Sequence, residues 1–187
     1  MFCINECTDA TKLLSLRNHV KCKRCFTRRF WAKDFYDSST RNTTDIEGNT
    51  LLMLAARDGH DELVGFLILQ RTKLNARNTA GDTALRLAAF RGHLKVAELL
   101  VAAGANLNTP GWTPLAYAAF NGHLDIARMM VKAGADLNQP SENGTTPLIA
   151  ASRGGHIEVV KLLLANRADP TKALMSGETA LDIALRN

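Results

Sequence analysis

Residues 81–108 read GDTALRLAAFRGHLKVAELLVAAGANLN, and this stretch decides the fold. Thr83 is a good helix N-cap, because its hydroxyl can accept a hydrogen bond from an otherwise free backbone amide. Apolar residues then recur at helical spacing as far as Gly92, which ends the helix because glycine adopts a left-handed backbone most easily. A second apolar run, 94–103, ends before Gly104 in the same way. The stretch therefore predicts two short helices followed by a polar turn.

This pattern repeats along the chain. The Gly-His pair recurs at intervals of 33, 30 and 33 residues, and a threonine followed two residues later by leucine keeps a matching spacing. The pairs are Gly59-His60, Gly92-His93, Gly122-His123 and Gly155-His156, and the threonines are Thr50, Thr83, Thr113, Thr146 and Thr179. Such regularity indicates stacked units, because one pair of short helices cannot bury its apolar faces alone.

The repeated residues resemble the ankyrin repeat family, most clearly over 81–108 and over 144–170, which reads GTTPLIAASRGGHIEVVKLLLANRADP. The resemblance implies an all-α solenoid over residues 45–187, with four full helix-turn-helix repeats and a C-terminal half repeat. The family's Thr-Pro-Leu-His opening is only partly kept. Its histidine position holds Met53, Arg86, Ala116, Ile149 and Asp182.

One inter-repeat loop is shorter than the others. Asn108 and Thr113 are five residues apart, whereas the equivalent residues at the other three loops are eight apart. The three missing residues come from a single hairpin tip. We therefore expect a notch in the row of hairpins beside Trp112.

Residues 1–44 differ in composition from the rest of the chain. They contain nine basic and four acidic residues, which accounts for the whole net charge of +5, and they hold all four cysteines. We expect two parts: a basic, Cys-rich, helical head at 1–44 that caps the first repeat, and the repeat array at 45–187. The cysteines suit free thiols in a reducing compartment, with a zinc site or disulfides as alternatives. The candidate zinc ligands are Cys3, Cys7, Cys22 and Cys25.

Several functional classes lack their sequence signals. No apolar run approaches the roughly 18 residues of a membrane span, and no signal peptide is recognisable, so a cytoplasmic protein is expected. Phosphate-loop and nucleophile-elbow motifs are absent. The repeated histidines are expected to lie roughly 8–10 Å apart, too far to share one zinc ion, and to bond to nearby backbone instead. We expect no enzyme and no cofactor apart from the zinc alternative.

The resemblance also implies where a partner binds. In the ankyrin family, recognition residues precede each threonine and each Gly-His pair on the concave face. These positions hold Asn49, Asp82, Trp112, Thr145 and Glu178, and then Arg57, Asp58, Phe90, Arg91, Phe120, Asn121, Arg153 and Gly154. Aromatic residues and arginine dominate binding energy at protein interfaces. We therefore predict that a monomeric chain binds another protein, mainly through Arg57, Phe90, Arg91, Trp112, Phe120, Asn121 and Arg153.

Two other interpretations compete with this one. The aromatic side chains can instead pack on one another and extend the core. Alternatively, the basic head contacts nucleic acid while the array recruits a partner. The array itself is not expected to bind nucleic acid, because residues 45–187 carry fourteen basic and fourteen acidic side chains and therefore no net charge.

Overall fold

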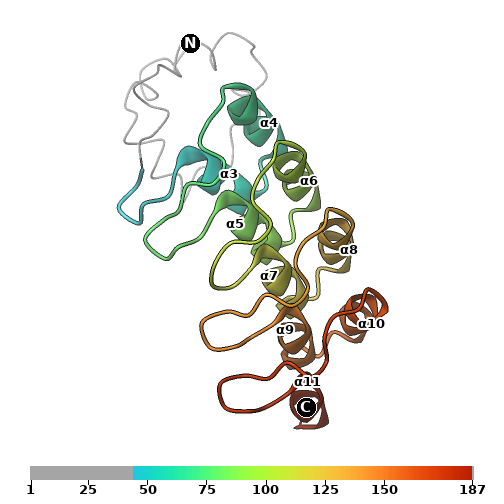
Figure 1. Cartoon of the computed structure of the whole chain (residues 1–187). Helices are drawn as coiled ribbons and strands as arrows, with labels where there is room; N and C mark the ends of the chain where they lie inside the picture. Colours follow the sequence, from blue (N-terminus) through green and yellow to red (C-terminus); the bar gives the residue numbers. More distant parts are fainter. Residues whose placement is uncertain (1–43, 187) are drawn as a thin grey trace, which may run out of the picture.

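The computed structural model describes residues 44–186, which form nine helices in two parallel rows (Figure 1). The inner row is α3 (Leu51–Asp58), α5 (Ala84–Arg91), α7 (Pro114–Phe120), α9 (Pro147–Arg153) and α11 (Ala180–Arg186). The outer row is α4 (Asp61–Leu69), α6 (Leu94–Ala102), α8 (Leu124–Lys132) and α10 (Ile157–Ala165). The predicted all-α solenoid of four repeats and a half repeat is confirmed. The predicted head and its cysteines lie outside the described residues.

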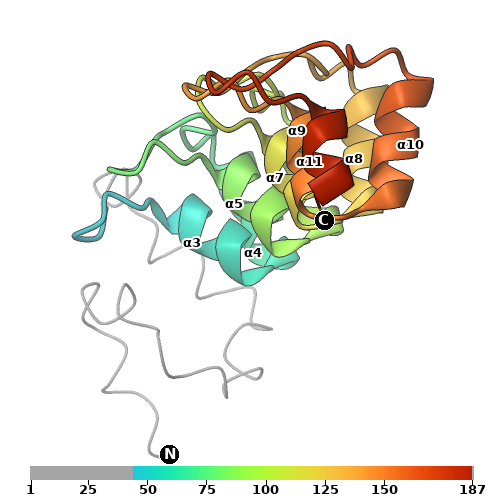
Figure 2. The same ribbon diagram turned by 90° about the horizontal axis from the view of Figure 1, so that it is seen from below.

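Hairpin loops project from the inner row and lie together along one edge of the stack (Figure 2). We call them fingers 1 to 5, at residues 44–50, 76–83, 106–113, 138–146 and 171–179. Finger 1 begins at Thr44, which forms an isolated antiparallel bridge with Thr50.

The inner helices begin and end where the local chemistry predicts. The Thr83 hydroxyl accepts a hydrogen bond from the Arg86 amide at 3.3 Å, and Gly92 closes α5 with a left-handed backbone at φ 83°. The same threonine cap precedes α3, α7 and α9. In α7 and α9 a proline follows the threonine, in the first turn, where a missing N–H costs nothing.

Small side chains let the inner helices lie close together. Paired alanines at the centre of these helices are at most 2% exposed, and the larger apolar side chains of the outer row seal the layer behind them. The alanines are Ala55, Ala56, Ala88, Ala89, Ala118, Ala119, Ala150 and Ala151, and the larger residues include Leu67, Leu100, Met130 and Leu163. Each repeat buries its apolar faces against its neighbours, as a solenoid requires.

The Gly-His pairs connect successive repeats. A histidine ring nitrogen of one repeat lies 3.0–3.2 Å from a backbone carbonyl of the preceding repeat, and because a carbonyl can only accept, the ring donates. The bonds are His93 to Arg57, His123 to Phe90 and His156 to Phe120. The prediction of a bond to backbone is thus confirmed for these three rings, with the acceptor in the neighbouring repeat.

The glycine of each pair makes room for the next histidine. A Cβ atom placed on Gly59, Gly92 or Gly122 would lie 2.5–2.6 Å from the histidine ring of the following repeat. All three glycines also have φ between 73° and 83°, a backbone conformation that residues with a side chain rarely adopt. Both the backbone conformation and the neighbouring ring therefore require glycine here.

Finger 3 differs from the other fingers, as its length predicts. Fingers 1, 2, 4 and 5 each close with an amide that donates to a carbonyl four residues later, at 2.9–3.1 Å. Finger 3 is instead held by side chains from both neighbouring fingers. Arg77 donates to the Pro110 carbonyl and Gln139 donates to the Thr109 carbonyl, each at 3.1 Å. Long side chains of the two neighbouring fingers thus form hydrogen bonds to the shortened loop.

The contact between repeats can be tested by comparing two glycines of the same turn type. Gly122→Ala adds a methyl group against His156 in a left-handed backbone, so we expect the free energy of unfolding to fall by roughly 2–4 kcal/mol. Gly155→Ala shares the backbone strain at φ 72°, but no other atom lies within 4 Å of its Cβ position. It should cost only about 1–2 kcal/mol.

Urea denaturation followed by circular dichroism would measure both values. Equal losses for the two variants would mean that the histidine ring does not constrain the turn.

Candidate binding surface

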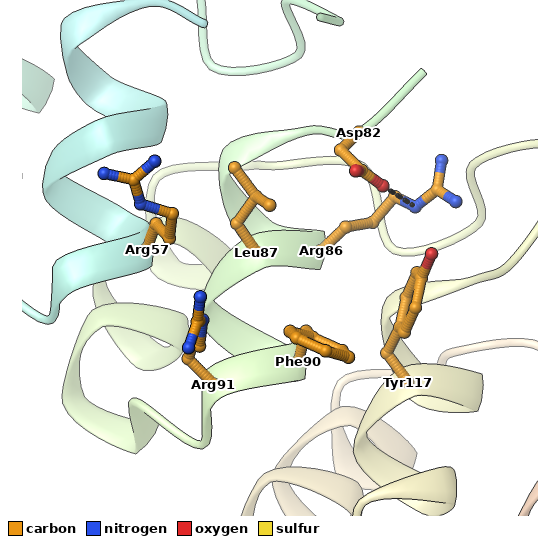
Figure 3. Close-up of a pocket in the computed structure, with 7 residues that line it drawn as sticks. All are labelled: Arg57, Asp82, Arg86, Leu87, Phe90, Arg91 and Tyr117. Carbon is orange, nitrogen blue, oxygen red and sulfur yellow. Dashed lines mark ion pairs between the residues drawn. The ribbon is translucent and has the colours of Figure 1, made fainter. Parts of the chain in front are cut away.

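A shallow pocket lies where α3, α5, α7 and finger 2 meet (Figure 3). Its lining residues are Arg57, Asp82, Arg86, Leu87, Phe90, Arg91 and Tyr117. The pocket thus brings together three of the predicted partner-binding residues, Arg57, Phe90 and Arg91. It also contains Arg86, Leu87 and Tyr117, which the sequence analysis did not single out.

The aromatic residues form a chain of ring contacts rather than one cluster. Phe90 contacts Tyr117 edge to face, with ring centroids 5.5 Å apart. Tyr117 contacts Trp112 at 5.2 Å, and Trp112 contacts Phe120 edge to face at 5.7 Å. Phe90, Trp112 and Phe120 were predicted to converge. Tyr117 connects Phe90 to Trp112, which in turn contacts Phe120. The contact between Phe90 and Tyr117 joins two repeats, so no local spacing in the sequence indicated it.

The rings differ in exposure. Trp112 and Phe120 are partly buried and pack against the core, whereas 41% of Phe90 is exposed. Core packing therefore accounts for part of the surface of Trp112 and Phe120. It leaves the Phe90 ring open to solvent at the pocket.

Arg86 is the buried cation of the site, with only 6% of the residue exposed. One terminal nitrogen donates to the Gly81 carbonyl at 2.6 Å, and Nε lies 3.4 Å from the Asp82 carboxylate. Its guanidinium carbon lies 5.3 Å from the centre of the Tyr117 ring. Arg86 occupies the histidine position of the family motif and ties finger 2 to α5 and α7. The four-residue spacing of Asp82 and Arg86 was the sequence signal for this pair.

The two other arginines of the pocket have different partners. Arg57 forms a two-point ion pair with Asp58, at 2.9 and 3.2 Å, and this carboxylate raises the pKa of the guanidinium. Arg91 lies over the Phe90 ring, with its guanidinium carbon 5.7 Å from the ring centre. Within residues 44–186, no carboxylate is within ion-pair distance of Arg91. Among the described residues, Arg91 is therefore the pocket arginine that has no carboxylate beside it.

Asn121 and Arg153 lie outside the pocket lining. The Asn121 side chain donates to the Phe90 and Tyr117 carbonyls, each at 3.2 Å, and so fixes the end of α7 against α5. Arg153 ends α9, and its charge acts on Glu178 of finger 5. Arg153 is thus not grouped with Arg57 and Arg91.

The expected exposure of the residue before each threonine is wrong for two fingers. Asn49 is 4% exposed and Thr145 is 1% exposed. The Asn49 amide donates to Asp45 at 3.0 Å, and the Thr145 hydroxyl donates to Asn143 at 2.8 Å. Asn49 also accepts a hydrogen bond from the Asn78 side chain of finger 2 at 2.8 Å. Because both side chains are buried in bonds within the row of fingers, they offer little surface to a partner.

The two rows of helices and the row of fingers define a repeat solenoid. The family model described as ankyrin repeats (3 copies) matches residues 1–110, 52–141, 109–173 and 133–187. These matches extend over the whole sequence. The chain belongs to the ankyrin repeat family.

Individual relatives match shorter segments. The rat NF-kappa-B p105 subunit is 41% identical over 68 residues, which is 34% of this chain and 7% of that protein. The human NF-kappa-B inhibitor alpha is 41% identical over 70 residues, 34% of this chain and 22% of that protein. The human NAD-capped RNA hydrolase NUDT12 is 40% identical over 68 residues, 36% of this chain and 15% of that protein. The chain thus spans less than a quarter of each relative, and no activity transfers with so short a match.

Two further findings concern the described residues alone. None of the helices between residues 44 and 186 has the length and apolar character that crossing a lipid bilayer requires. The same part of the chain contains no group of three or more His, Cys, Asp or Glu side chains placed to share a metal ion.

Two arginines on α5 allow a matched test of the pocket wall. Arg86→Met removes a buried hydrogen bond and leaves Asp82 without its cation, so we expect a loss of about 1–3 kcal/mol in the free energy of unfolding. Arg91→Met makes the same change at an exposed residue and should cost at most about 0.5 kcal/mol. Thermal and urea unfolding would measure both. A similar stability for the two variants would contradict the structural role of Arg86.

Proposed function

We propose that this chain is a protein-interaction module that binds a partner protein through the inner helices and fingers, and that it catalyses no reaction. Ankyrin repeats are protein-interaction modules, and the family assignment supports this class of function. One similar protein, NF-kappa-B inhibitor alpha, is named for its action on another protein. The observation that carries the proposal is the exposed Phe90 ring beside Arg91, whose charge has no carboxylate partner among the described residues.

An exposed aromatic ring next to such a cation is a favourable contact point. Burying the ring against a partner removes apolar surface from water, at about 25 cal/mol per Å². Aromatic and arginine side chains of this kind commonly contribute about 2 kcal/mol or more each at interfaces. The chemistry of the surface is thus that of a protein-binding site.

Phe90 is held by hydrogen bonds and a ring contact that form without a partner. The carbonyl of Phe90 accepts hydrogen bonds from Asn121 and His123, each at 3.2 Å, and its ring is braced by Tyr117. Arg86 holds the adjacent finger. A preformed surface loses little conformational entropy on binding, which leaves more of the contact energy as affinity.

The other expectations from the sequence stay predictions. The nucleic-acid alternative and the zinc alternative both depend on the head, which lies outside the described residues. The cytoplasmic location and the monomeric state are likewise untested.

The proposal is tested by truncating two side chains of the pocket. Phe90→Ala combined with Arg91→Ala should weaken partner capture at least about 30-fold, which corresponds to one hot spot of about 2 kcal/mol. The melting temperature should stay close to that of the unmodified chain, because both side chains are exposed. Affinity capture from an extract of the native cells, quantified by mass spectrometry, would give the measurement.

A matched control truncates an apolar and a basic side chain on the outer row. Leu164 is exposed on α10 and Lys132 is exposed on α8, so Leu164→Ala with Lys132→Ala should leave capture unchanged. If both double variants retained the same captured proteins, the partner would not bind the pocket side of the array.

A further inference from the structure

We propose that the pocket between α3, α5 and α7 binds an acidic segment of the partner, in which a carboxylate lies next to a large apolar side chain. This inference rests on the proposed function and adds the chemistry of the partner. It follows from the apolar floor of the pocket, from the distribution of charge around it and from the hydrogen bonding of the helix ends.

The floor of the pocket is apolar and has a defined shape. Leu87 and Phe90 lie at its centre, and Tyr117 forms the wall on the α7 side (Figure 3). Phe90 and Tyr117 meet edge to face at an interplanar angle of 86°, so they form a corner. A large aliphatic or aromatic side chain that enters this corner contacts both rings and leucine at once.

The charge is concentrated on the side of the pocket away from Tyr117. Arg57 and Arg91 reach this side from α3 and α5 (Figure 3). The positive charge of the third arginine, Arg86, is neutralised by Asp82, and the charge of Arg57 is paired with Asp58. Arg91 is left without a carboxylate partner inside residues 44–186, and it lies directly beside the apolar floor. A carboxylate matches one planar guanidinium, because the two can form paired hydrogen bonds.

Hydrogen bonds from the next repeat reduce the repulsion of an anion at the helix ends. The last carbonyls of a helix carry partial negative charge, which disfavours a carboxylate. Here the Arg57 carbonyl accepts from His93 at 3.0 Å, and the Phe90 carbonyl accepts from His123 and Asn121 at 3.2 Å. These two oxygens are therefore already paired with donors beside the pocket.

The same charges disfavour nucleic acid as the occupant. The array carries equal numbers of acidic and basic side chains, so it produces no overall attraction for a polyanion. Two carboxylates, Asp58 and Asp82, lie beside the pocket arginines and would repel successive phosphates. A single carboxylate beside an apolar residue carries one negative charge and is therefore repelled less than a run of phosphates.

Peptide selection on the full chain tests the inference. A phage library of random twelve-residue peptides is selected against the unmodified chain, against Arg91→Glu and against Lys132→Glu, an exposed charge reversal on the outer row. We expect the unmodified chain to select peptides with Asp or Glu next to Leu, Phe, Trp or Tyr. Fluorescence anisotropy with these synthetic peptides should show at least about 10-fold weaker binding to Arg91→Glu, and no change for Lys132→Glu.

A charge exchange provides the sharper result. Replacing the acidic residue of a selected peptide by lysine should abolish binding to the unmodified chain and restore binding to Arg91→Glu. Restored binding requires that the two charges meet, which a general effect of the substitution on the fold would not produce.

The outcomes separate this inference from the proposed function. Selected peptides without acidic residues, whose binding depends on Phe90 but not on Arg91, would overturn the inference and leave the proposed function standing. Peptides that bind Phe90→Ala and Arg91→Glu as tightly as they bind the unmodified chain would overturn both the inference and the proposed function. A failure to select any peptide would overturn the inference, while the capture experiment decides the proposed function independently. If a twenty-nucleotide oligothymidine bound tightly to the unmodified chain and not to Arg91→Glu, the inference would be overturned, because the ligand of the pocket would be nucleic acid.

Discussion

The contact between the glycine of one repeat and the histidine of the next is the constraint on which the rest of the structure depends. The ring fits only because Gly59, Gly92 and Gly122 lack a side chain, and its nitrogen bonds to a carbonyl at the end of the preceding inner helix. This contact fixes the distance and orientation between neighbouring repeats, and the paired alanines then fill the remaining space. Stacking is thereby specified by chemistry that recurs in each repeat.

The proposed binding surface depends on the same contact. Arg57 and Phe90 lie two residues before the glycine of a Gly-His pair, and the carbonyl of each accepts a hydrogen bond from the histidine ring of the following repeat. The position of each side chain therefore depends on two repeats rather than one. In the proposed binding surface, Phe90 and Arg91 lie next to each other on α5, a helix of only eight residues.

The fold was largely predictable from sequence because its determinants are local. Thr83 caps α5 and Gly92 ends it within a span of ten residues, and the repeat multiplies that signal. The site was harder to predict. Tyr117 joins Phe90 to Trp112 across two repeats, and Arg86 fills a position that is apolar in the other full repeats, so both roles depend on tertiary packing. The burial of Asn49 and Thr145 follows from hydrogen bonds inside fingers whose conformation the family pattern does not specify.

Finger 3 shows that loop length and repeat stacking vary independently in this chain. Three residues are missing, yet α7 keeps its threonine cap and its contacts with both neighbours, because Arg77 and Gln139 support the shortened loop from outside. The short finger 3 is thus compatible with normal packing of α7 between α5 and α9, as expected where length differences are confined to surface loops. Such a scaffold can change its specificity through length polymorphism as well as through substitution, and a designer could graft fingers of other lengths beside Trp112 while keeping the helical frame.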